Sequence, residues 1–398
     1  MTKFAGVDFL ELDELLSPAD REVRAKFRDW VETRYLPIIR EHFEKATFPL
    51  ERAREIAELG ALGANLPDYG CAGLTPLQYG LVMQELERGD SGLRTFASVQ
   101  GALAMNAIHA FGSDEQKQRW LPAMARAEKL GCFGLTEPDH GSNPAGMSTS
   151  AKAHRGGYVL NGRKMWIGLG TVADIAVVWA KANDIDEVDP NSADAIRGFL
   201  VERGTPGFTT ELIEGKHSLR AANTSRLFFE DCYVPSDALL PKAKGMKSLF
   251  VCLNQARYGI AWGAVGAAMA CYEEAREYAG QREQFGRRIG GFQLVQRKLA
   301  LMLTQITTSQ LLVFRLAQLV ASGRATFAQI SMAKRHNVAA ALEIARTARE
   351  ILGAVGILDQ YQCFRHMANL ESVKTYEGTD DMHLLVLGRH ITGLAAFS

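Results

Sequence analysis

Three long periodic segments in the last third of the chain place the strongest limit on its fold. They cover residues 256–282, 292–323 and 327–356, and apolar residues recur in them every three or four positions. Each segment is longer than the usual helix of a globular protein. Helices of this length bury their apolar faces best against one another. We therefore predict a C-terminal helical bundle over residues 245–398.

The first 130 residues also have a helical pattern. Ser17 can cap a helix that starts at Pro18, because a hydroxyl accepts from free N–H groups and proline is tolerated in the first turn. Further helical patterns follow at FPLERAREIAELGAL, TPLQYGLVMQELERG and SDEQKQRWLPAMARAE. We predict an N-terminal helical domain over residues 1–130.

The pattern changes at about Leu130. The stretch GYVLNGRKMWI alternates and contains Asn161-Gly162, which predicts a β-hairpin turn. Strand-like segments follow, and an acidic stretch at 183–194 is expected to be an exposed loop. The predicted fold class is α+β, mostly α, with a central β domain over residues 131–244. The predicted strands are 174–182, 196–202, 207–213 and 225–234.

Composition limits the partner class. Lys plus Arg and Asp plus Glu each number 45, so no bulk field favours nucleic acid. The six cysteines are scattered, without a CxxC pair or a Cys/His cluster, which favours reduced thiols and no metal site. The N-terminus has no signal pattern, and the weakly polar run 260–271 is too short to span a bilayer. We expect a cytoplasmic protein, without a membrane span, that acts on a polar or amphipathic small molecule.

One short stretch concentrates acidic groups. The sequence KTYEGTDDMH holds Glu377, Asp380 and Asp381 within five residues. One of them could be a catalytic acid or base, or the stretch could be a polar loop between two helices. For an isolated acid the loop interpretation is favoured.

Four segments in order carry a family resemblance. CFGLTEPDHGSNP (132–144), NGRKMWI (161–167), REQFGRRIGGFQ (282–293) and TYEGTDDMH (375–383) resemble the flavin and substrate motifs of acyl-CoA dehydrogenases. Within that family, segments 86–100, 216–224, 253–267 and 387–397 resemble those of glutaryl-CoA dehydrogenases. The resemblance covers essentially the whole chain.

The resemblance implies a fold, a cofactor and a reaction. The family has an N-terminal helical domain, a central β domain and a C-terminal four-helix bundle, usually as a homotetramer or dimer of dimers. FAD is expected between the β domain and the bundle, with a neighbouring subunit over its pyrophosphate and adenine end. In the family reaction a carboxylate removes the α-proton of a CoA thioester and the β-hydrogen leaves as hydride to flavin N5. An electron-transfer flavoprotein is the expected acceptor.

Glu377 matches the family base. Burial should raise its pKa toward the range useful for proton transfer. The resemblance also implies that the thioester oxygen binds the Glu377 N–H and a flavin ribityl hydroxyl. Gly378 permits close approach of the backbone to the ligand. Asp380 has no family role and is expected to face solvent.

The resemblance assigns flavin contacts residue by residue. Trp166 and Ile167 are expected to form a wall of the ring site, although a tryptophan in a strand is more often core packing. Arg282 is expected to bind pyrophosphate of the partner subunit's FAD, against the alternative of an ordinary surface arginine. The full set of expected cofactor contacts is Phe133, Leu135, Thr136, Gly141, Ser142, Trp166, Ile167, Gly168, Arg282, Phe285, Gln293, Gly353, Ala354, Thr379, Asp381 and Phe397.

Arg94 is the most discriminating substrate residue. A cation in an apolar acyl pocket is costly unless it meets a carboxylate. In glutaryl-CoA dehydrogenases the matching arginine holds the distal substrate carboxylate, and oxidation can be followed by loss of CO2 to give crotonyl-CoA. The alternative is a simple Glu87–Arg94 ion pair. The expected substrate contacts are Glu87, Arg94, Thr95, Ser142, Asn254, Arg257 and Gly378.

The sequence departs from the family near the flavin. Gly168-Leu169-Gly170 replaces Thr-Asn-Ser/Gly, so the hydroxyl that family members offer near flavin N5 is missing. Gly353-Ala354-Val355-Gly356 replaces Gly-Gly-Asn-Gly, Asn143 replaces an aspartate, and Thr95 replaces a serine. These changes are neutral drift, or they admit O2 and make the chain a flavin oxidase or oxygenase on another, cyclic or aromatic, CoA ester. A third hypothesis, a non-catalytic CoA-ester binding protein, is disfavoured by the retained Glu377.

Overall fold

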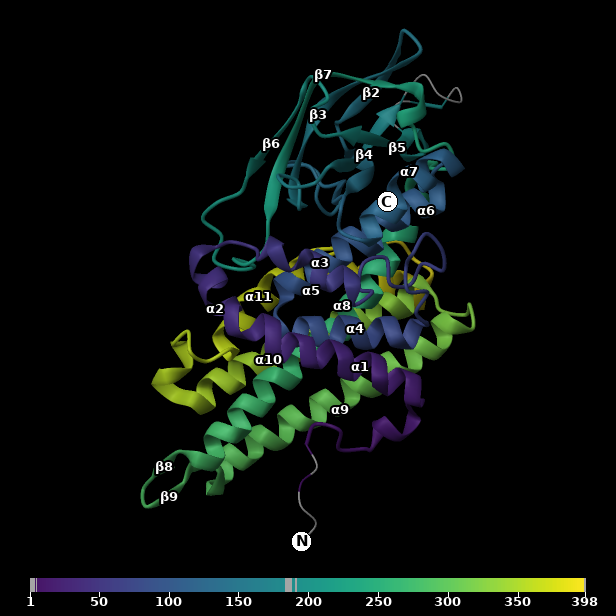
Figure 1. Cartoon of the computed structure of the whole chain (residues 1–398). Coiled ribbons are helices and arrows are strands. Elements are labelled where there is room, and N and C mark those ends of the chain that lie inside the picture. The colour runs from purple at the N-terminus through teal and green to yellow at the C-terminus, as the bar shows by residue number, and fades with distance from the viewer. Residues whose placement is uncertain (1–3, 5, 183–187, 190–191, 397–398) are drawn as a thin grey trace.

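The computed structural model describes residues 4, 6–182, 188–189 and 192–396. Helices occupy both ends of the chain and a sheet lies between them in sequence, as predicted (Figure 1). The N-terminal helices are α1 (Pro18–Trp30), α2 (Leu36–Lys45), α3 (Ala53–Glu58), α4 (Pro76–Gly89), α5 (Ser91–Ala97), α6 (Asn106–Phe111) and α7 (Asp114–Ala125). Two π-helical stretches, Val31–Tyr35 and Ser98–Met105, make α1–α2 and α5–α6 continuous.

The predicted cap at Ser17 is confirmed. Its hydroxyl accepts from the Asp20 N–H, and the Asp20 carboxylate accepts from the Ser17 N–H, which closes a capping box ahead of Pro18. Thr75 makes the same arrangement with Gln78 at the start of α4. Local sequence therefore fixes where these helices begin.

The described strands of the central region form one seven-stranded sheet. Its order is β1-β4-β2-β3-β7-β6, with β5 on the other edge of β4. The strands are β1 (Gly131–Gly134), β2 (Ser150–His154), β3 (Gly157–Gly168), β4 (Ile175–Ala182), β5 (Ile196–Glu202), β6 (Phe208–Leu212) and β7 (Thr224–Pro235). The four predicted strand segments are confirmed. Most of the predicted loop at 183–194 lies outside the described residues.

The predicted hairpin turn at Asn161-Gly162 is wrong. Both residues lie inside β3, and the β2–β3 turn is at Arg155-Gly156, where both residues have positive φ. Asn161 instead exchanges hydrogen bonds with Asp231 on β7, at a register shift between β3 and β7. An Asn-Gly pair suits a bulge as well as a turn, because both need unusual backbone angles.

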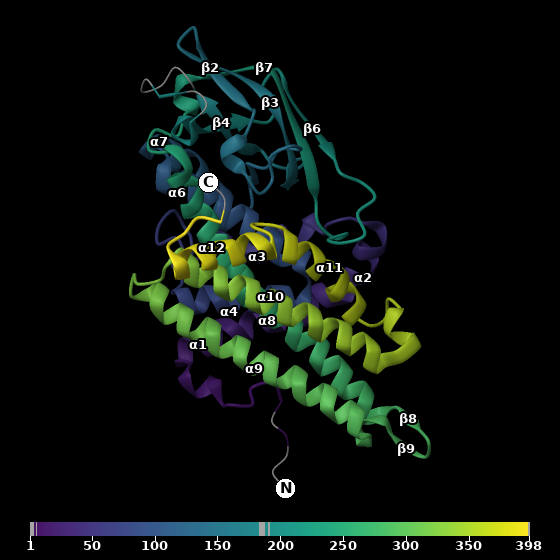
Figure 2. The ribbon, with the colours of Figure 1, turned by 180° about the vertical axis from the view of Figure 1, so that it is seen from behind.

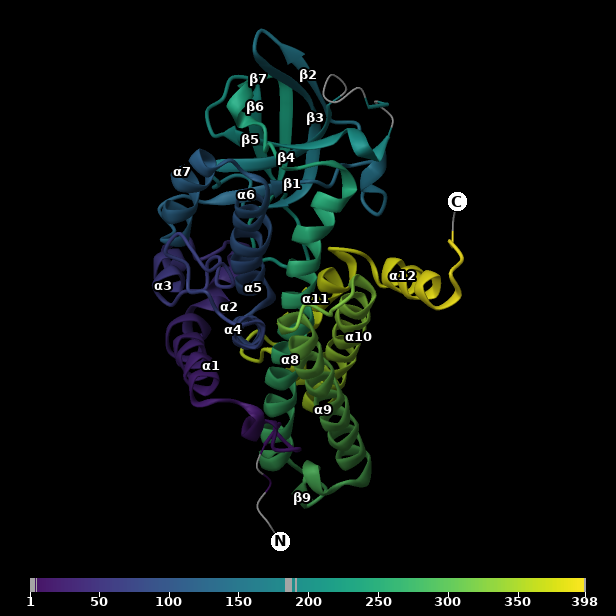
Figure 3. The ribbon, with the colours of Figure 1, turned by 90° about the vertical axis from the view of Figure 1, so that its right-hand side faces the viewer.

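The C-terminal region is a bundle of long helices. They are α8 (Gly245–Gln281), α9 (Gln293–Ala321), α10 (Phe327–Leu352), α11 (Cys363–Thr375) and α12 (Asp380–Thr392), with the two-stranded hairpin β8 (Glu283–Gln284) and β9 (Arg287–Arg288) between α8 and α9. The hairpin lies at the end of the bundle far from the sheet, and α11 lies between the sheet and the bundle (Figures 1 and 2). Seen from the side, α12 projects away from the bundle (Figure 3).

Among the described residues, α9 is long and apolar enough to cross a membrane by length and composition alone. This is weak support for a span, because helices packed inside a bundle meet the same criterion. Here α9 packs against α8 and α10. The six cysteines are all free thiols, and no cluster of metal-ligating side chains occurs in the described part of the chain.

Candidate active site

Glu377 lies in the short connection between α11 and α12, at the junction of the N-terminal helices and the bundle. Its φ is 53°, and Gly378 follows with φ 98°. Two successive residues in the left-handed region bend the chain sharply, which costs free energy for a non-glycine residue and is typical of functional sites. The Thr379 hydroxyl then accepts from the Met382 N–H and starts α12. That hydroxyl, expected on the cofactor, therefore has a capping role within the chain.

The carboxylate of Glu377 is shielded from water and has an unpartnered oxygen. The residue as a whole is half-buried, yet Oε2 is fully covered and meets no hydrogen-bond donor among the described residues. Burial raises the pKa of Glu377, and the positive charges of Arg94, Arg257 and Lys334 partly oppose this shift. A shielded carboxyl group with a raised pKa and a free oxygen has the properties of a general base.

Two cations bind the backbone on either side of Glu377. Arg257 Nε donates to the Glu377 carbonyl oxygen at 2.8 Å. Lys334 Nζ donates to the carbonyl oxygens of Tyr376 at 3.0 Å and Gly378 at 2.8 Å. The sequence prediction included Arg257 but missed Lys334. One signal was available, because Lys334 lies at helical spacing from the apolar residues Ile330, Val338 and Ala341.

Glu87 and Arg94 form a fully buried ion pair. Arg94 Nε lies 2.8 Å from Glu87 Oε2, and the Ser91 hydroxyl donates to the other carboxylate oxygen. The Glu87–Arg94 ion pair, the alternative to a substrate-binding role for Arg94, therefore exists. It lies close to the proposed base. Helix α8 approaches α4 closely here, since a Cβ on Gly263 would lie 2.0 Å from Glu87 Oε2. Only glycine leaves room for this carboxylate.

Arg94 also links the pair to the Glu377 segment. Its Nη2 donates to the Tyr376 hydroxyl, and its guanidinium lies 5.5 Å from the centre of the Tyr376 ring. Buried polar side chains nearby have atoms without a partner in the described chain, which is what a site for a polar ligand provides. They are Tyr79 Oη, Thr95 Oγ1, Ser98 Oγ and Asn254 Oδ1.

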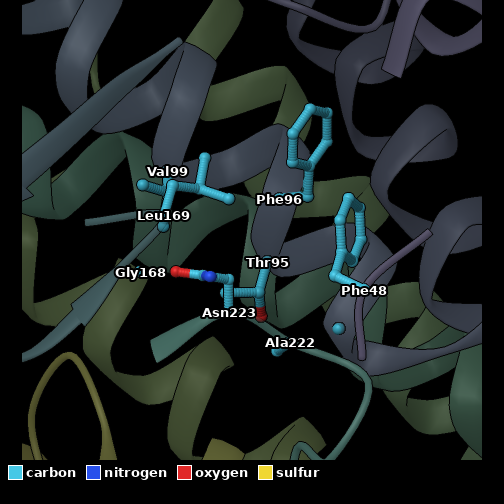
Figure 4. A pocket seen from close by; sticks show the side chains of 9 residues that line it. Phe48, Thr95, Phe96, Val99, Gly168, Leu169, Ala222 and Asn223 are labelled. Atoms are coloured by element: carbon cyan, nitrogen blue, oxygen red, sulfur yellow. The ribbon is translucent and has the colours of Figure 1, made fainter. Parts of the chain in front are cut away.

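A small cavity lies beside Thr95. Its volume is about 10 Å³, room for about one water molecule, and Gly168 forms part of its wall (Figure 4). Phe48 and Phe96 stack against each other, with ring centres 4.8 Å apart, and both line the cavity. The other lining residues are Gly92, Val99, Leu169, Ala222 and Asn223.

A buried ion pair fixes the segment that was expected to contact the flavin. The Glu137 carboxylate accepts from the N–H and hydroxyl groups of Ser148 and Thr149 and from Lys164 Nζ at 2.9 Å. Lys164 Nζ also donates to the Leu135 carbonyl oxygen. Neither Glu137 nor Lys164 was predicted. Phe133 is buried against Trp179, whereas Thr136 is half-buried. Thr136 is therefore more accessible to a cofactor than Phe133.

The end of β3 has unusual backbone geometry. Trp166 has φ 64° and its indole is 56% exposed, although it lies within a strand. Ile167 is buried in the core. Leu169 has φ 65°, a conformation that asparagine tolerates better than leucine, so the departure from the family at this position is strained. A Cβ on Gly168 would lie 3.0 Å from Val99 Cγ2, which leaves little room for the missing threonine.

Other predicted cofactor residues do not join this site within one chain. Arg282, Phe285 and Gln293 belong to the hairpin end of the bundle, and Phe285 is 94% exposed. The remaining predicted residues are exposed on three separate segments or lie outside the described residues. Gly141, Ser142, Gly353, Ala354 and Asp381 are exposed, and Phe397 lies outside the described residues.

The expectation that Asp380 faces solvent is wrong. Its side chain is largely buried and pairs with Arg335 on α10, with Arg335 Nε 3.3 Å from Asp380 Oδ1. Asp380 is in the first turn of α12, where a carboxylate also suits the helix dipole.

A cleft of about 510 Å³ lies at the N-terminus of α8. Lys244, Lys247 and Arg197 line it, together with one carboxylate, that of Asp194, and the helix N-terminus adds partial positive charge. Arg257 follows twelve residues along the same helix, about 18 Å away at the rise of an α-helix.

Comparison with known proteins agrees with this arrangement. Models of the acyl-CoA dehydrogenase N-terminal, middle and C-terminal domains match residues 17–128, 132–232 and 243–392. Human mitochondrial short-chain specific acyl-CoA dehydrogenase is 35% identical over 366 residues, covering 92% of this chain and 88% of that protein.

Solved structures give the same result. A crystal structure of glutaryl-CoA dehydrogenase from Mycobacterium smegmatis has 50% identity and a TM-score of 0.95, covering 99% of this chain and all of that one. A second from the same organism, in complex with FADH2, has 46% identity, a TM-score of 0.96 and complete coverage of both chains. A structure from work on the electron transferring flavoprotein of Acidaminococcus fermentans has 32% identity and a TM-score of 0.90, covering 95% of this chain and 98% of that one. This chain belongs to the acyl-CoA dehydrogenase family of FAD-dependent oxidoreductases.

Proposed function

We propose that the chain oxidises a CoA thioester between its α and β carbons, with Glu377 as the base, and that the acyl group ends in a carboxylate, as in glutaryl-CoA. The observation that carries the proposal is the buried cluster around Glu377. Its carboxylate has a free, shielded oxygen, and Arg94, Arg257 and Lys334 surround it.

The base would work as follows. In the substrate complex the free Oε2 takes the α-proton, and the Glu377 N–H is a donor for the thioester oxygen as negative charge develops there. FAD, when bound, supplies the hydride acceptor. The exposed Trp166 indole near the end of β3, on a backbone in the left-handed region, fits a flat ring, and the open surface at Gly141 leaves room for a phosphate chain.

The charge of the cluster favours a carboxylated acyl chain. Glu87 balances Arg94. An ionised Glu377 offsets only one of the two positive charges of Arg257 and Lys334, and burial raises the pKa of Glu377. A substrate carboxylate would compensate the excess positive charge, and Thr95 and Ser98 have free hydroxyl oxygens to meet it. The likeness to glutaryl-CoA dehydrogenase supports the same assignment. Loss of CO2 from the oxidised product, giving crotonyl-CoA, is the expected second step.

The CoA phosphates are assigned to the cleft at the start of α8. Lysine ammonium groups and a helix N-terminus are typical phosphate ligands. The CoA chain would then follow α8 toward Arg257 and Asn254.

A homotetramer would complete the cofactor site. Arg282 and Phe285 lie at the β8–β9 hairpin, which is at the end of the bundle far from the sheet (Figure 1), so we expect them to contact FAD in a neighbouring copy. The exposed apolar side chains of α12, Ile391 and Leu394 of the following turn, are further candidates for subunit contacts. The free cysteines support the proposed cytoplasmic location, a reducing compartment.

A second candidate function is a flavin oxidase or oxygenase. Gly168 favours it, because no side chain stands there between the small cavity and the expected flavin edge. Under this hypothesis O2, rather than an electron-transfer flavoprotein, accepts the electrons.

One experiment separates these functions. The purified holoenzyme is mixed anaerobically with glutaryl-CoA, butyryl-CoA and a cyclic acyl-CoA, and flavin bleaching is followed. Fast bleaching of the flavin by glutaryl-CoA supports the proposal. If glutaryl-CoA does not bleach the flavin although the enzyme retains its FAD, the proposal is contradicted. Rapid return of the oxidised flavin colour when O2 is admitted, with label from 18O2 in the product, would establish an oxygenase. Turnover only with an electron-transfer flavoprotein or a dye would exclude an oxygenase.

A further inference from the structure

The backbone on both sides of Glu377 is bound by buried cations. Three successive carbonyl oxygens, of Tyr376, Glu377 and Gly378, each accept a hydrogen bond, two from Lys334 and one from Arg257. Lys334 is 1% exposed, and the mechanism described above gives it no part in proton or hydride transfer. A buried lysine is costly, so a role for this one is expected.

The geometry of the peptide group gives Lys334 a directional effect. A peptide unit is planar and trans, so its C=O and N–H point in opposite directions. Lys334 on α10 binds the carbonyl oxygen of Tyr376, and the N–H of the same peptide unit belongs to Glu377. This N–H therefore points away from α10. The second bond, to Gly378, fixes the far side of the bend.

We infer that Lys334 is a positioning residue for the reaction: given the proposed role of Glu377 as the base, it orients the Glu377 N–H toward the thioester oxygen and holds the carboxylate in its left-handed bend. Its ammonium group also lies close enough to stabilise the ionised form of Glu377.

Several other ionisable groups share this environment. Arg94 reaches it from α5 and Arg257 from α8, while α12 contributes Asp380 and His383. His383 is neutral over the working range, because burial lowers its pKa to about 3. Burial likewise lowers the pKa of Lys334 to about 7, so its charge changes near neutrality.

A purely structural role is the alternative. The Lys334 ammonium group reaches from α10 to the C-terminal end of α11, where a cation stabilises a helix by binding its last carbonyl groups. Such a role would change the melting temperature but not the rate or pH dependence of proton abstraction.

The test compares the Lys334→Met, Lys334→Gln, Arg335→Met and Glu377→Gln holoenzymes. Anaerobic flavin reduction by glutaryl-CoA or butyryl-CoA, whichever reduces the parent faster, is measured by stopped flow from pH 5.5 to 9. FAD content and melting temperature are recorded for each. Lys334→Gln keeps a donor without the charge, and Arg335→Met removes a neighbouring cation that pairs only with Asp380 in the described chain.

The inference makes distinct predictions for each variant. Lys334→Met should reduce flavin about tenfold more slowly, with little change in the substrate concentration needed for half the maximal rate. The rise of the rate with pH should move to higher pH, because the cation lowers the pKa of Glu377. Lys334→Gln should recover much of the rate at high pH but keep the shifted profile. Arg335→Met should match the parent.

A Lys334→Met enzyme within twofold of the parent rate, with an unshifted profile, would overturn the inference. If Lys334→Met binds no FAD, the pH profile of Lys334→Gln is used instead. An unshifted pH profile of Lys334→Gln would then overturn the inference. If Glu377→Gln is fully active, the base assignment fails instead. An inactive Glu377→Gln beside a Lys334→Met that behaves like the parent rejects the role of Lys334 alone.

Discussion

Arg257 Nε donates a 2.8 Å hydrogen bond to the main-chain carbonyl oxygen of Glu377, so α8 holds the loop between α11 and α12 by its backbone and leaves the carboxylate free. Because the interaction is with the backbone, substitutions of the Glu377 side chain should leave the loop in place. Side-chain chemistry and loop geometry can therefore be tested separately.

Glu377→Gln should slow anaerobic flavin reduction about 10³-fold without loss of FAD, because the amide cannot accept the α-proton. The matched control is Asp380→Asn, which should keep most activity. Flavin reduction in Glu377→Gln close to the parent rate would exclude Glu377 as the base.

The same variant should change stability with pH. Burial raises the pKa of Glu377, so the folded protein retains a proton that the unfolded chain releases above about pH 4.5. The parent therefore loses stability as the pH rises from 4.5 through the raised pKa, and Glu377→Gln should not. Urea unfolding at pH 5 and pH 8 measures the difference, and a variant advantage that shrinks toward pH 8 would contradict the shift.

Arg94→Met should reduce kcat/KM for glutaryl-CoA by about 10²- to 10³-fold and that for butyryl-CoA much less, if Arg94 binds the distal carboxylate. Removing Arg94 alone leaves Glu87 buried and unpaired, so the double variant Glu87→Gln/Arg94→Met is the proper control for folding. Equal losses for both substrates in the double variant would assign the pair a structural role.

Glu137→Gln should destabilise the protein by about 3–5 kcal/mol, because it leaves Lys164 buried without a counter-charge. Burial by itself raises the pKa of Glu137, but Lys164 and the hydroxyl and N–H donors outweigh burial and lower it to about 2. The stabilisation is therefore complete above about pH 4.5 and is lost as the pH falls toward 2.

Unfolding of the parent and of Glu137→Gln over pH 3–7 tests this. The double variant Glu137→Gln/Lys164→Met should recover part of the lost stability, since both charges are then gone. Loose binding of FAD by Glu137→Gln is also expected, because the pair fixes the segment from Phe133 to Thr136. A constant difference between parent and variant down to pH 3 would argue against the ion pair as the cause.

Gly168→Thr should destabilise the protein by about 1–3 kcal/mol, because its Cβ would press on Val99. Val99→Ala should relieve that contact in the double variant. If the missing hydroxyl controls reactivity toward O2, the reduced double variant should reoxidise in air more slowly than Val99→Ala alone. Equal reoxidation rates would show that Gly168 does not control the reaction of the reduced flavin with O2.

Some local features could be predicted from short sequence patterns. Ser17 begins a helix as expected, and β5 covers the predicted residues 196–202, because caps and alternating apolar residues depend on near neighbours. Asn161-Gly162 misled the prediction, because a bulge and a turn need similar backbone angles and the choice depends on Asp231, seventy residues away.

The site shows the same division. The family resemblance predicted site roles for Glu377, Arg94 and Arg257, which the structure brings together. It did not predict Lys334 or the Glu137–Lys164 pair, whose partners are distant in the chain. No local rule states that the Lys334 ammonium group would bind the carbonyl oxygens of Tyr376 and Gly378, which lie 42 and 44 residues further along the chain.

The sequence by itself determined the order of helices and strands and several helix starts, and it singled out Glu377 as the candidate base, because local hydrogen bonding, periodicity and motif order carry that information. Only the tertiary structure decided the electrostatics of the site. Desolvation raises the pKa of Glu377 and buries the charge of Arg94. Lys334 binds the carbonyl oxygens beside Glu377 because α10 packs near the loop between α11 and α12. Both effects exist only when α4, α5, α8 and α10 are packed together with that loop.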